Sequence, residues 1–253
     1  MAAHPRFVAT LILGMLGIFA QGSARAAELV VLTNQGATPG VTELANAFAR
    51  TSGHKITVIQ EAGAALDQRL VNGPADVVTG NPEQIAALVK KGQVAGGTET
   101  PFALASLGVS VRAGLPKPDI STVEAYKTAL LAAKSIGYSR GCSGTHAAEG
   151  IAKLGLTELL KAKTVITDAG PVVEYLAKGA FDLGIQQTNI MVGVPGTDYV
   201  GEPPGFLNDP CPSSAALVKV SKEPEAARAF IRFMISPEAA PLLRKTRVEP
   251  AKS

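Results

Sequence analysis

Short apolar runs, each followed by a polar loop and a helical pattern, recur along the chain and constrain its fold more than any other feature. The first three runs are Glu28–Leu32, Lys55–Ile59 and Ala75–Val78. Between the first two, apolar residues recur at helical spacing until Gly53. Runs without polar alternation are typical of parallel strands that helices cover on both faces. This order predicts an α/β fold with doubly wound sheets.

The second half of the chain repeats the pattern, which predicts two similar lobes. Its strand-like runs are Leu107–Val111, Ser135–Ser139, Thr164–Thr167, Asp182–Gln187 and Ala215–Val220. We expect the runs Phe102–Val111 and Ser213–Val220 to pass between the lobes as a two-strand hinge. Lobe 1 would then comprise residues 27–104 plus 217–253, and lobe 2 residues 105–216. The cleft between two such lobes is a preferred place for a small ligand.

Three helix starts carry capping signals. Thr38 and Asn81 each precede a proline, so each is a predicted N-cap with proline at the first helical position. Ser121 with Glu124 has the spacing of a capping box. These signals predict where three of the helices begin.

Composition excludes several classes of protein. Hydrophobic residues make up 46% of the 253 residues, which is enough for a core and excludes a disordered chain. Aromatic residues make up only 5% and Trp is absent, so platforms for stacking single-stranded nucleic acid are scarce. Of 24 Lys and Arg, Arg6 and Arg25 fall in a predicted leader, which leaves a net charge of about +1 against 21 Asp and Glu. We therefore expect no nucleic-acid partner.

The N-terminus has the pattern of an export signal. A basic start is followed by the apolar run Val8–Ala20 and then by small residues at Ala24 and Ala26. The alternative, a membrane anchor, is disfavoured because spanning a bilayer takes about 20 apolar residues. We predict that residues 1–26 are a cleaved signal peptide and that the mature protein is a periplasmic monomer.

Export makes a disulfide possible, and the chain has two cysteines, Cys142 and Cys211. A single disulfide and a pair of reduced or buried thiols both remain open, because sequence alone does not place the two Cα atoms. Neither cysteine has a neighbour at zinc-ligand spacing, so no metal or other cofactor is predicted.

Parallel lobes bind ligands at the carboxyl ends of their strands, against helix N-termini. In the first half, that rule selects the loop with Asn34, Gln35 and Gly36, and a second loop with Glu61 and Gly63. Backbone amides and glycines there would let a ligand approach closely. Ordinary turns and a solvated Glu61 are the alternative interpretation.

In the second half, the most distinctive loop follows the run Ser135–Ser139 and opens a helix. Its candidate ligand-binding residues are Arg140, Ser143, Gly144 and Thr145. Arg140 could hold a carboxylate with two parallel hydrogen bonds, and the others could supply hydroxyls and N–H groups. A further candidate is Gln187, which ends another strand-like run.

Two common motifs for phosphate binding and nucleophilic catalysis are absent from the sequence. It contains neither a phosphate-binding G-x-x-x-x-G-K-[ST] loop nor a G-x-S-x-G nucleophile elbow. Cys142 and His146, four residues apart, could form a thiolate pair, but a structural cysteine beside a helix start is the favoured interpretation.

Several segments together resemble the periplasmic molybdate-binding proteins, within the type II solute-binding proteins of ABC importers. They include ELVVLTNQGATPGVTELANAFARTSGHK, VSVRAGLPKPDISTVEAYKTALLAAKSIGYS, AKGAFDLGIQQ and EPEAARAFIRFMISPEAAPLL. The resemblance implies two α/β lobes, hinged by two crossing strands, that close on a small ligand for a membrane permease.

The resemblance also indicates a divergent subgroup. The serines and the tyrosine that hold molybdate in that family correspond here to Gly36, to Gly63 or its neighbour, and to Gln187. The amides of residues 168–170 remain, and Arg140 is an addition that suits a carboxylate. Weak molybdate binding is therefore expected.

Two main functions follow from the sequence. The first is a periplasmic solute-binding protein that captures a small oxyanion or carboxylate for an ABC importer. The alternative is a periplasmic isomerase of a small unsaturated di- or tricarboxylate, similar to aconitate isomerases, with His146 or Glu61 as the base. A stand-alone sensor is a third possibility.

Overall fold

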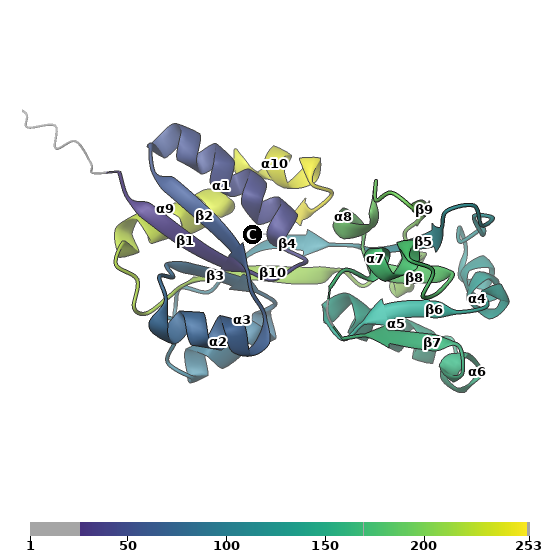
Figure 1. Cartoon of the computed structure of the whole chain (residues 1–253). Coiled ribbons are helices and arrows are strands. Elements are labelled where there is room, and N and C mark those ends of the chain that lie inside the picture. The colour runs from purple at the N-terminus through teal and green to yellow at the C-terminus, as the bar shows by residue number, and fades with distance from the viewer. Residues whose placement is uncertain (1–25, 169, 252–253) are drawn as a thin grey trace, which may run out of the picture.

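A computed structural model describes residues 26–168 and 170–251 as two α/β lobes lying side by side (Figure 1). Each lobe is a sheet flanked by helices, which confirms the predicted fold class. Of the predicted leader, residues 1–25 lie outside the described range, so the signal peptide stays a prediction. Within that range, no helix is long and apolar enough to cross a membrane.

The first lobe contains a six-stranded sheet with the strand order β11-β4-β10-β3-β1-β2. Its strands are β1 (Glu28–Thr33), β2 (Lys55–Gln60), β3 (Val77–Gly80), β4 (Thr100–Ala105), β10 (Cys211–Leu217) and β11 (Glu249–Pro250). Strands β1, β2 and β3 are parallel, as predicted, whereas β4, β10 and β11 pair in antiparallel fashion.

Helices cover both faces of this sheet. They are α1 (Thr38–Ser52), α2 (Gly63–Asn72), α3 (Pro82–Lys90), α9 (Pro224–Met234) and α10 (Ala239–Lys245). Leu29 and Val31 of β1 pack in one core with α1, α9 and α10, while Leu32 packs in a second core with α2 and α3. Both faces of the strand are therefore buried, which explains its lack of polar alternation.

The second lobe contains a five-stranded sheet with the order β7-β6-β8-β5-β9. Its strands are β5 (Leu107–Arg112), β6 (Ile136–Ser139), β7 (Thr164–Thr167), β8 (Leu183–Gln187) and β9 (Thr197–Gly201). Its helices are α4 (Val123–Ala132), α5 (Cys142–Lys153), α6 (Thr157–Lys161), α7 (Val172–Ala177) and α8 (Thr188–Met191), with the 3₁₀ turn η1 (Gly205–Leu207). Strands β6, β7 and β8 are parallel, so their carboxyl ends share one edge.

The chain crosses between the lobes twice. The first crossing lies within the predicted run Phe102–Val111, where β4 leads into β5 through Ser106. The second lies at residues 202–210, before β10. Because β10 pairs with β3 and β4, the run Ser213–Val220 does not cross, and residues 211–216 belong to the first sheet rather than to the predicted lobe 2.

Two of the predicted helix caps differ in the structure. Asn81 caps α3 as expected, and its side chain accepts a hydrogen bond from the Gln84 amide. Helix α1 already includes Thr38, because the Asn34 side chain closes the preceding turn by accepting from the Ala37 amide. In α4 the cap is Thr122, one residue after the predicted Ser121.

A disulfide joins Cys142, the first residue of α5, to Cys211, the first residue of β10. The Cα atoms are 5.9 Å apart. This settles the alternative that the sequence left open, and the bond connects the second lobe to the first sheet.

Candidate functional site

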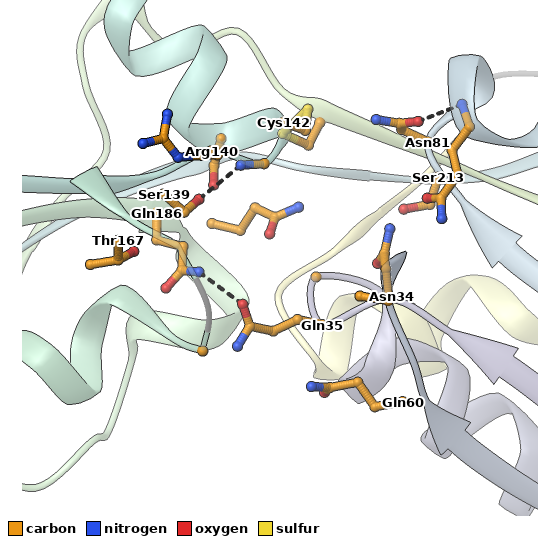
Figure 2. A pocket seen from close by; sticks show the side chains of 18 of the residues that line it. Asn34, Gln35, Gln60, Asn81, Ser139, Arg140, Cys142, Thr167, Gln186 and Ser213 are labelled. Atoms are coloured by element: carbon orange, nitrogen blue, oxygen red, sulfur yellow. Dashed lines mark hydrogen bonds between the residues drawn. A yellow bond between two sulfur atoms is a disulfide. The ribbon is translucent and has the colours of Figure 1, made fainter. Parts of the chain in front are cut away.

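A cavity of ≈ 430 Å³ lies between the lobes, at the carboxyl ends of the parallel strands of both sheets. Its lining from the first sheet is Asn34, Gln35, Gly36, Gln60, Glu61, Ala62, Asn81, Gln84, Cys211, Pro212 and Ser213. Its lining from the second lobe is Ser139, Arg140, Gly141, Cys142, Ser143, Thr167, Asp168, Gly170, Gln186 and Gln187. Figure 2 shows polar side chains of both lobes gathered around this space.

Carboxamides of the first lobe are oriented by their own loops. Asn34 Oδ1 accepts from the Ala37 amide at 3.0 Å, and Asn81 Oδ1 accepts from the Gln84 amide at 2.8 Å. Both oxygens are therefore engaged with backbone, which leaves the two NH₂ groups as the free hydrogen-bonding ends. Gln60 is arranged similarly, since its Oε1 accepts from the Thr38 hydroxyl at 3.1 Å.

A carboxamide of the second lobe is buried at the end of β8. Gln186 is 2% exposed, and its Oε1 accepts from the Val172 amide at the start of α7 at 2.8 Å. Its Nε2 donates to Gln35 Oε1 of the first lobe at 3.2 Å, the contact drawn across the cavity in Figure 2. This bond leaves the NH₂ group of Gln35 available as a donor.

Hydroxyl groups add to these donors. Ser143, Thr167 and Ser213 line the cavity and are each less than one-tenth exposed. The Thr167 Oγ1 is buried and finds no hydrogen-bond partner among the residues that the structure describes. A buried hydroxyl without a partner is costly, so a ligand group is the natural partner for this one.

The N-terminus of α5 faces the cavity. Its N-cap, Gly141, supplies no side-chain cap, so first-turn amides remain for a ligand. Gly144 lies beside the end of β6, and any Cβ on it would collide with the Ser139 carbonyl oxygen. Gly144 therefore permits close packing of α5 on β6 and does not line the cavity; Thr145 is exposed and lies outside the lining as well.

Arg140 lies at the rim of the cavity and forms an ion pair with Asp168. Its Nε donates to Asp168 Oδ1 at 2.6 Å, and both side chains are more than two-thirds exposed. Asp168 therefore binds the Nε side of the guanidinium, and the terminal N–H groups can still donate to a ligand.

Neither of the two candidate bases is free in the cavity. Glu61 lines it, but its Oε1 accepts from Arg69 through Nε and Nη2, both at 3.1 Å. His146 lies outside the lining, and its Nδ1 is 2.8 Å from the carbonyl oxygen of Asp209.

Gly36 lies against the carboxamide of Gln187 from the second lobe. A Cβ at this position would collide with the side chain of Gln187 from the second lobe. The Gly36 carbonyl also accepts from Asn189 Nδ2 at 2.8 Å, a second contact between the lobes. Gly63, selected with Gly36 from the sequence, begins α2 and does not line the cavity.

Several lining residues were not among the sequence candidates, notably Asn81, Thr167 and Ser213. Asn81 follows β3 and Thr167 ends β7, so the strand-end rule that selected the other loops could have found these two. Ser213 needed the antiparallel pairing of β10, which the sequence does not reveal.

Taken together, the cavity offers many neutral donors and few free acceptors. Its lining carboxylates, Glu61 and Asp168, each pair with an arginine. A site of oriented NH₂ groups, hydroxyls and helix amides is complementary to a small anion.

The chain is similar to known proteins of one family whose members differ in the small molecule that they bind or convert. The family model described as bacterial extracellular solute-binding protein matches residues 29–246. An aconitate isomerase of Pseudomonas sp. is 33% identical over 229 residues, which is 88% of this chain and 87% of that protein. The molybdate-binding protein ModA of Azotobacter vinelandii is 26% identical over 255 residues, covering 94% and 95% of the two chains.

Solved structures show the same architecture. The periplasmic molybdate-binding protein of Azotobacter vinelandii superposes with a TM-score of 0.70 at 22% identity, covering 88% of this chain and 100% of that one. The two-lobe arrangement is therefore shared with proteins that hold a small anion.

Proposed function

The chain belongs to the family of bacterial extracellular solute-binding proteins, and on this premise we propose that it captures a small carboxylate-bearing anion in the cavity between its lobes. The observation that carries the proposal is the orientation of the lining carboxamides. Asn34, Asn81 and Gln186 each have the oxygen engaged by a backbone amide. A ligand rich in acceptors satisfies the NH₂ groups that remain.

A carboxylate fits this lining better than molybdate. Gly36 and Gln187 stand where the resemblance places a serine and a tyrosine of the molybdate binders, so side-chain donors of that site are lost. Donors instead come from both lobes around a cavity of ≈ 430 Å³, which has room for a ligand with more than one carboxylate. Arg140 at the rim adds a fork-shaped donor that matches a carboxylate.

In this proposal the protein acts in the periplasm, as a monomer, and presents its ligand to the permease of an ABC importer. Family membership supports the delivery role. The predicted signal peptide supports export.

A second candidate function is isomerisation of an unsaturated carboxylate, which the 33% identity to an aconitate isomerase favours. A base would remove a proton from a carbon next to the double bond and return it at the other end of the allylic system, so the double bond moves with no net change in atoms. Glu61 and Asp168 are the carboxylates at the cavity, and each would first have to leave its arginine.

A thermal-shift screen tests the binding proposal. The panel would contain molybdate, sulfate, and di- and tricarboxylates that include cis- and trans-aconitate. At one hundred times its dissociation constant, a ligand stabilises the protein by about 2.7 kcal/mol. A shift with carboxylates alone supports the proposal, whereas no shift with any carboxylate contradicts it.

Deuterated water separates the two candidate functions. A carboxylate that binds would be incubated with the protein in deuterated water and followed by proton NMR. Loss of carbon-bound protons or appearance of the isomer supports catalysis. Binding with an unchanged spectrum supports transport.

A further inference from the structure

We propose that, when the disulfide is reduced, Cys142, Cys211 and His146 bind a zinc-class divalent cation that joins the two lobes in its place. In the structure the two sulfurs and the imidazole of His146 lie within 4.8 Å of one another. Sequence spacing gave no sign of this cluster, because Cys211 lies 69 residues from Cys142 and reaches it only through the fold.

The distances suit a tetrahedral ion. Zinc–sulfur bonds of about 2.3 Å and zinc–nitrogen bonds of about 2.0 Å place neighbouring ligand atoms about 3.5–3.8 Å apart. His146 Nε2 is already 3.8 Å from Cys142 Sγ. Cys142 Sγ is also 3.9 Å from His146 Nδ1, so after reduction the imidazole has to turn until Nε2 faces the ion, and the two sulfurs have to separate. Water can complete the coordination.

A backbone carbonyl fixes the tautomer of His146. His146 Nδ1 is 2.8 Å from the carbonyl oxygen of Asp209, so Nδ1–H donates there. The lone pair then resides on Nε2, which is one of the ring nitrogens beside the sulfur. A backbone carbonyl that fixes the second ring nitrogen is the arrangement typical of histidines that bind metals.

The surroundings favour ion binding as well. Cys142 begins α5, and the positive end of a helix favours a thiolate there. Cys211 is 1% exposed, whereas the His146 side chain is 19% exposed and gives an entry path. Cys142 and Cys211 line the cavity whereas His146 does not, so the proposed ion would lie in the cavity wall.

The chemistry balances with a phosphine as the reductant. The phosphine and one water reduce the disulfide to two thiols and become the phosphine oxide. Binding the cation then releases the two thiol protons. A metal bridge thereby replaces the disulfide as the cross-link between α5 and β10.

The test is a titration of the full chain with Co²⁺, which reports thiolate ligands by charge-transfer absorption. Protein reduced with tris(carboxyethyl)phosphine should show this band and saturate at one ion per chain, and Zn²⁺ should displace it. The oxidised protein should show no band. An absent band after reduction, or an equal band in the oxidised protein, would overturn the proposal.

Variants show which residues hold the ion. His146→Ala should weaken Co²⁺ binding at least about tenfold, which is the smaller end of what loss of an outer-shell partner costs a metal site. His54→Ala, a control that removes another histidine, should leave binding unchanged. Cys142→Ser should abolish the band even if His146→Ala fails to fold. Equal binding by folded His146→Ala and wild-type protein would contradict the assignment.

Discussion

Gln35 and Gln186 meet across the cavity, where Gln186 Nε2 donates a hydrogen bond of 3.2 Å to Gln35 Oε1. Each side chain comes from a different lobe, so the bond exists only when the lobes are closed. The same Gln186 also holds the start of α7 through the Val172 amide. Closure of the cleft and order within the second lobe are thus connected through one buried carboxamide.

This relationship predicts different effects for the two partners. Gln186→Leu leaves the buried Val172 N–H without an acceptor and should lower the free energy of unfolding by about 1–3 kcal/mol. Gln35→Leu removes the acceptor of Gln186 Nε2, but this donor faces the cavity, where water can replace Gln35, so the effect should stay within about 0.5 kcal/mol. Urea unfolding of both variants measures the difference, and equal losses would refute it.

Gly36→Ala should impair closure without unfolding the protein. Its new Cβ would collide with Gln187 across the cleft, while Gly36 does not have the positive φ that only glycine adopts readily. We expect ligand affinity to fall by no more than about tenfold, or about 1.4 kcal/mol, because the group that must move is the flexible end of the Gln187 side chain. The double variant Gly36→Ala/Gln187→Ala should bind as tightly as Gln187→Ala alone in calorimetry, because Gln187 itself lines the cavity. A further loss of affinity in the double variant would show that closure is not limited by this contact.

Thr167→Val should separate stability from binding. The change replaces a buried hydroxyl that has no hydrogen-bond partner among the described residues with a methyl group of similar shape, so the free energy of unfolding should stay equal or rise. The free energy of ligand binding should weaken by the contribution of one hydrogen bond, about 0.5–1.5 kcal/mol. Thermal unfolding and calorimetry check both. A variant that binds as tightly as the wild type would mean that Thr167 does not contact the ligand.

Arg140 and Asp168 should act in opposite directions on an anionic ligand. Arg140→Ala removes a positive charge and should weaken carboxylate binding by at least about tenfold, or about 1.4 kcal/mol. This is less than the about 2–5 kcal/mol typical of buried pairs, because this arginine is exposed. Asp168→Asn releases the guanidinium and should strengthen binding. Arg140→Lys should rescue binding only in part, since the fork geometry is lost. Calorimetry at constant salt measures all three, and unchanged affinity in Arg140→Ala would leave Arg140 as a solvated charge.

Much of the fold and part of the site could be predicted from the sequence. Runs such as Glu28–Leu32 are apolar on both faces because helices cover both sides of their sheet, so they predict parallel strands. The loop that contains Asn34 could be predicted as part of the site because it comes directly after the carboxyl end of such a strand. Ser213 could not be predicted, because its place depends on β10 returning antiparallel to the first sheet. Because β10 already belongs to the first sheet from Cys211, the predicted end of lobe 2 at residue 216 lies too late in the chain.

Side-chain roles were harder to predict than positions. The strand-end rule places Glu61 at the cleft, where it lines the cavity, but only the structure shows that Arg69 pairs with its carboxylate. The sequence also makes Gly144 a candidate ligand residue, whereas in the structure its small size allows α5 to pack against Ser139. Such differences arise from contacts between segments that are distant in sequence or packed at a turn, which a linear pattern does not encode.

The central claim is that the cavity binds a small carboxylate through neutral donors and discriminates against molybdate. Calorimetric titration of the wild-type protein with trans-aconitate and with molybdate, at one fixed salt concentration, tests it most directly. The account predicts a single saturable site for the carboxylate and weak or undetectable heat for molybdate. Tight one-to-one binding of molybdate, with none for the carboxylate, would contradict it.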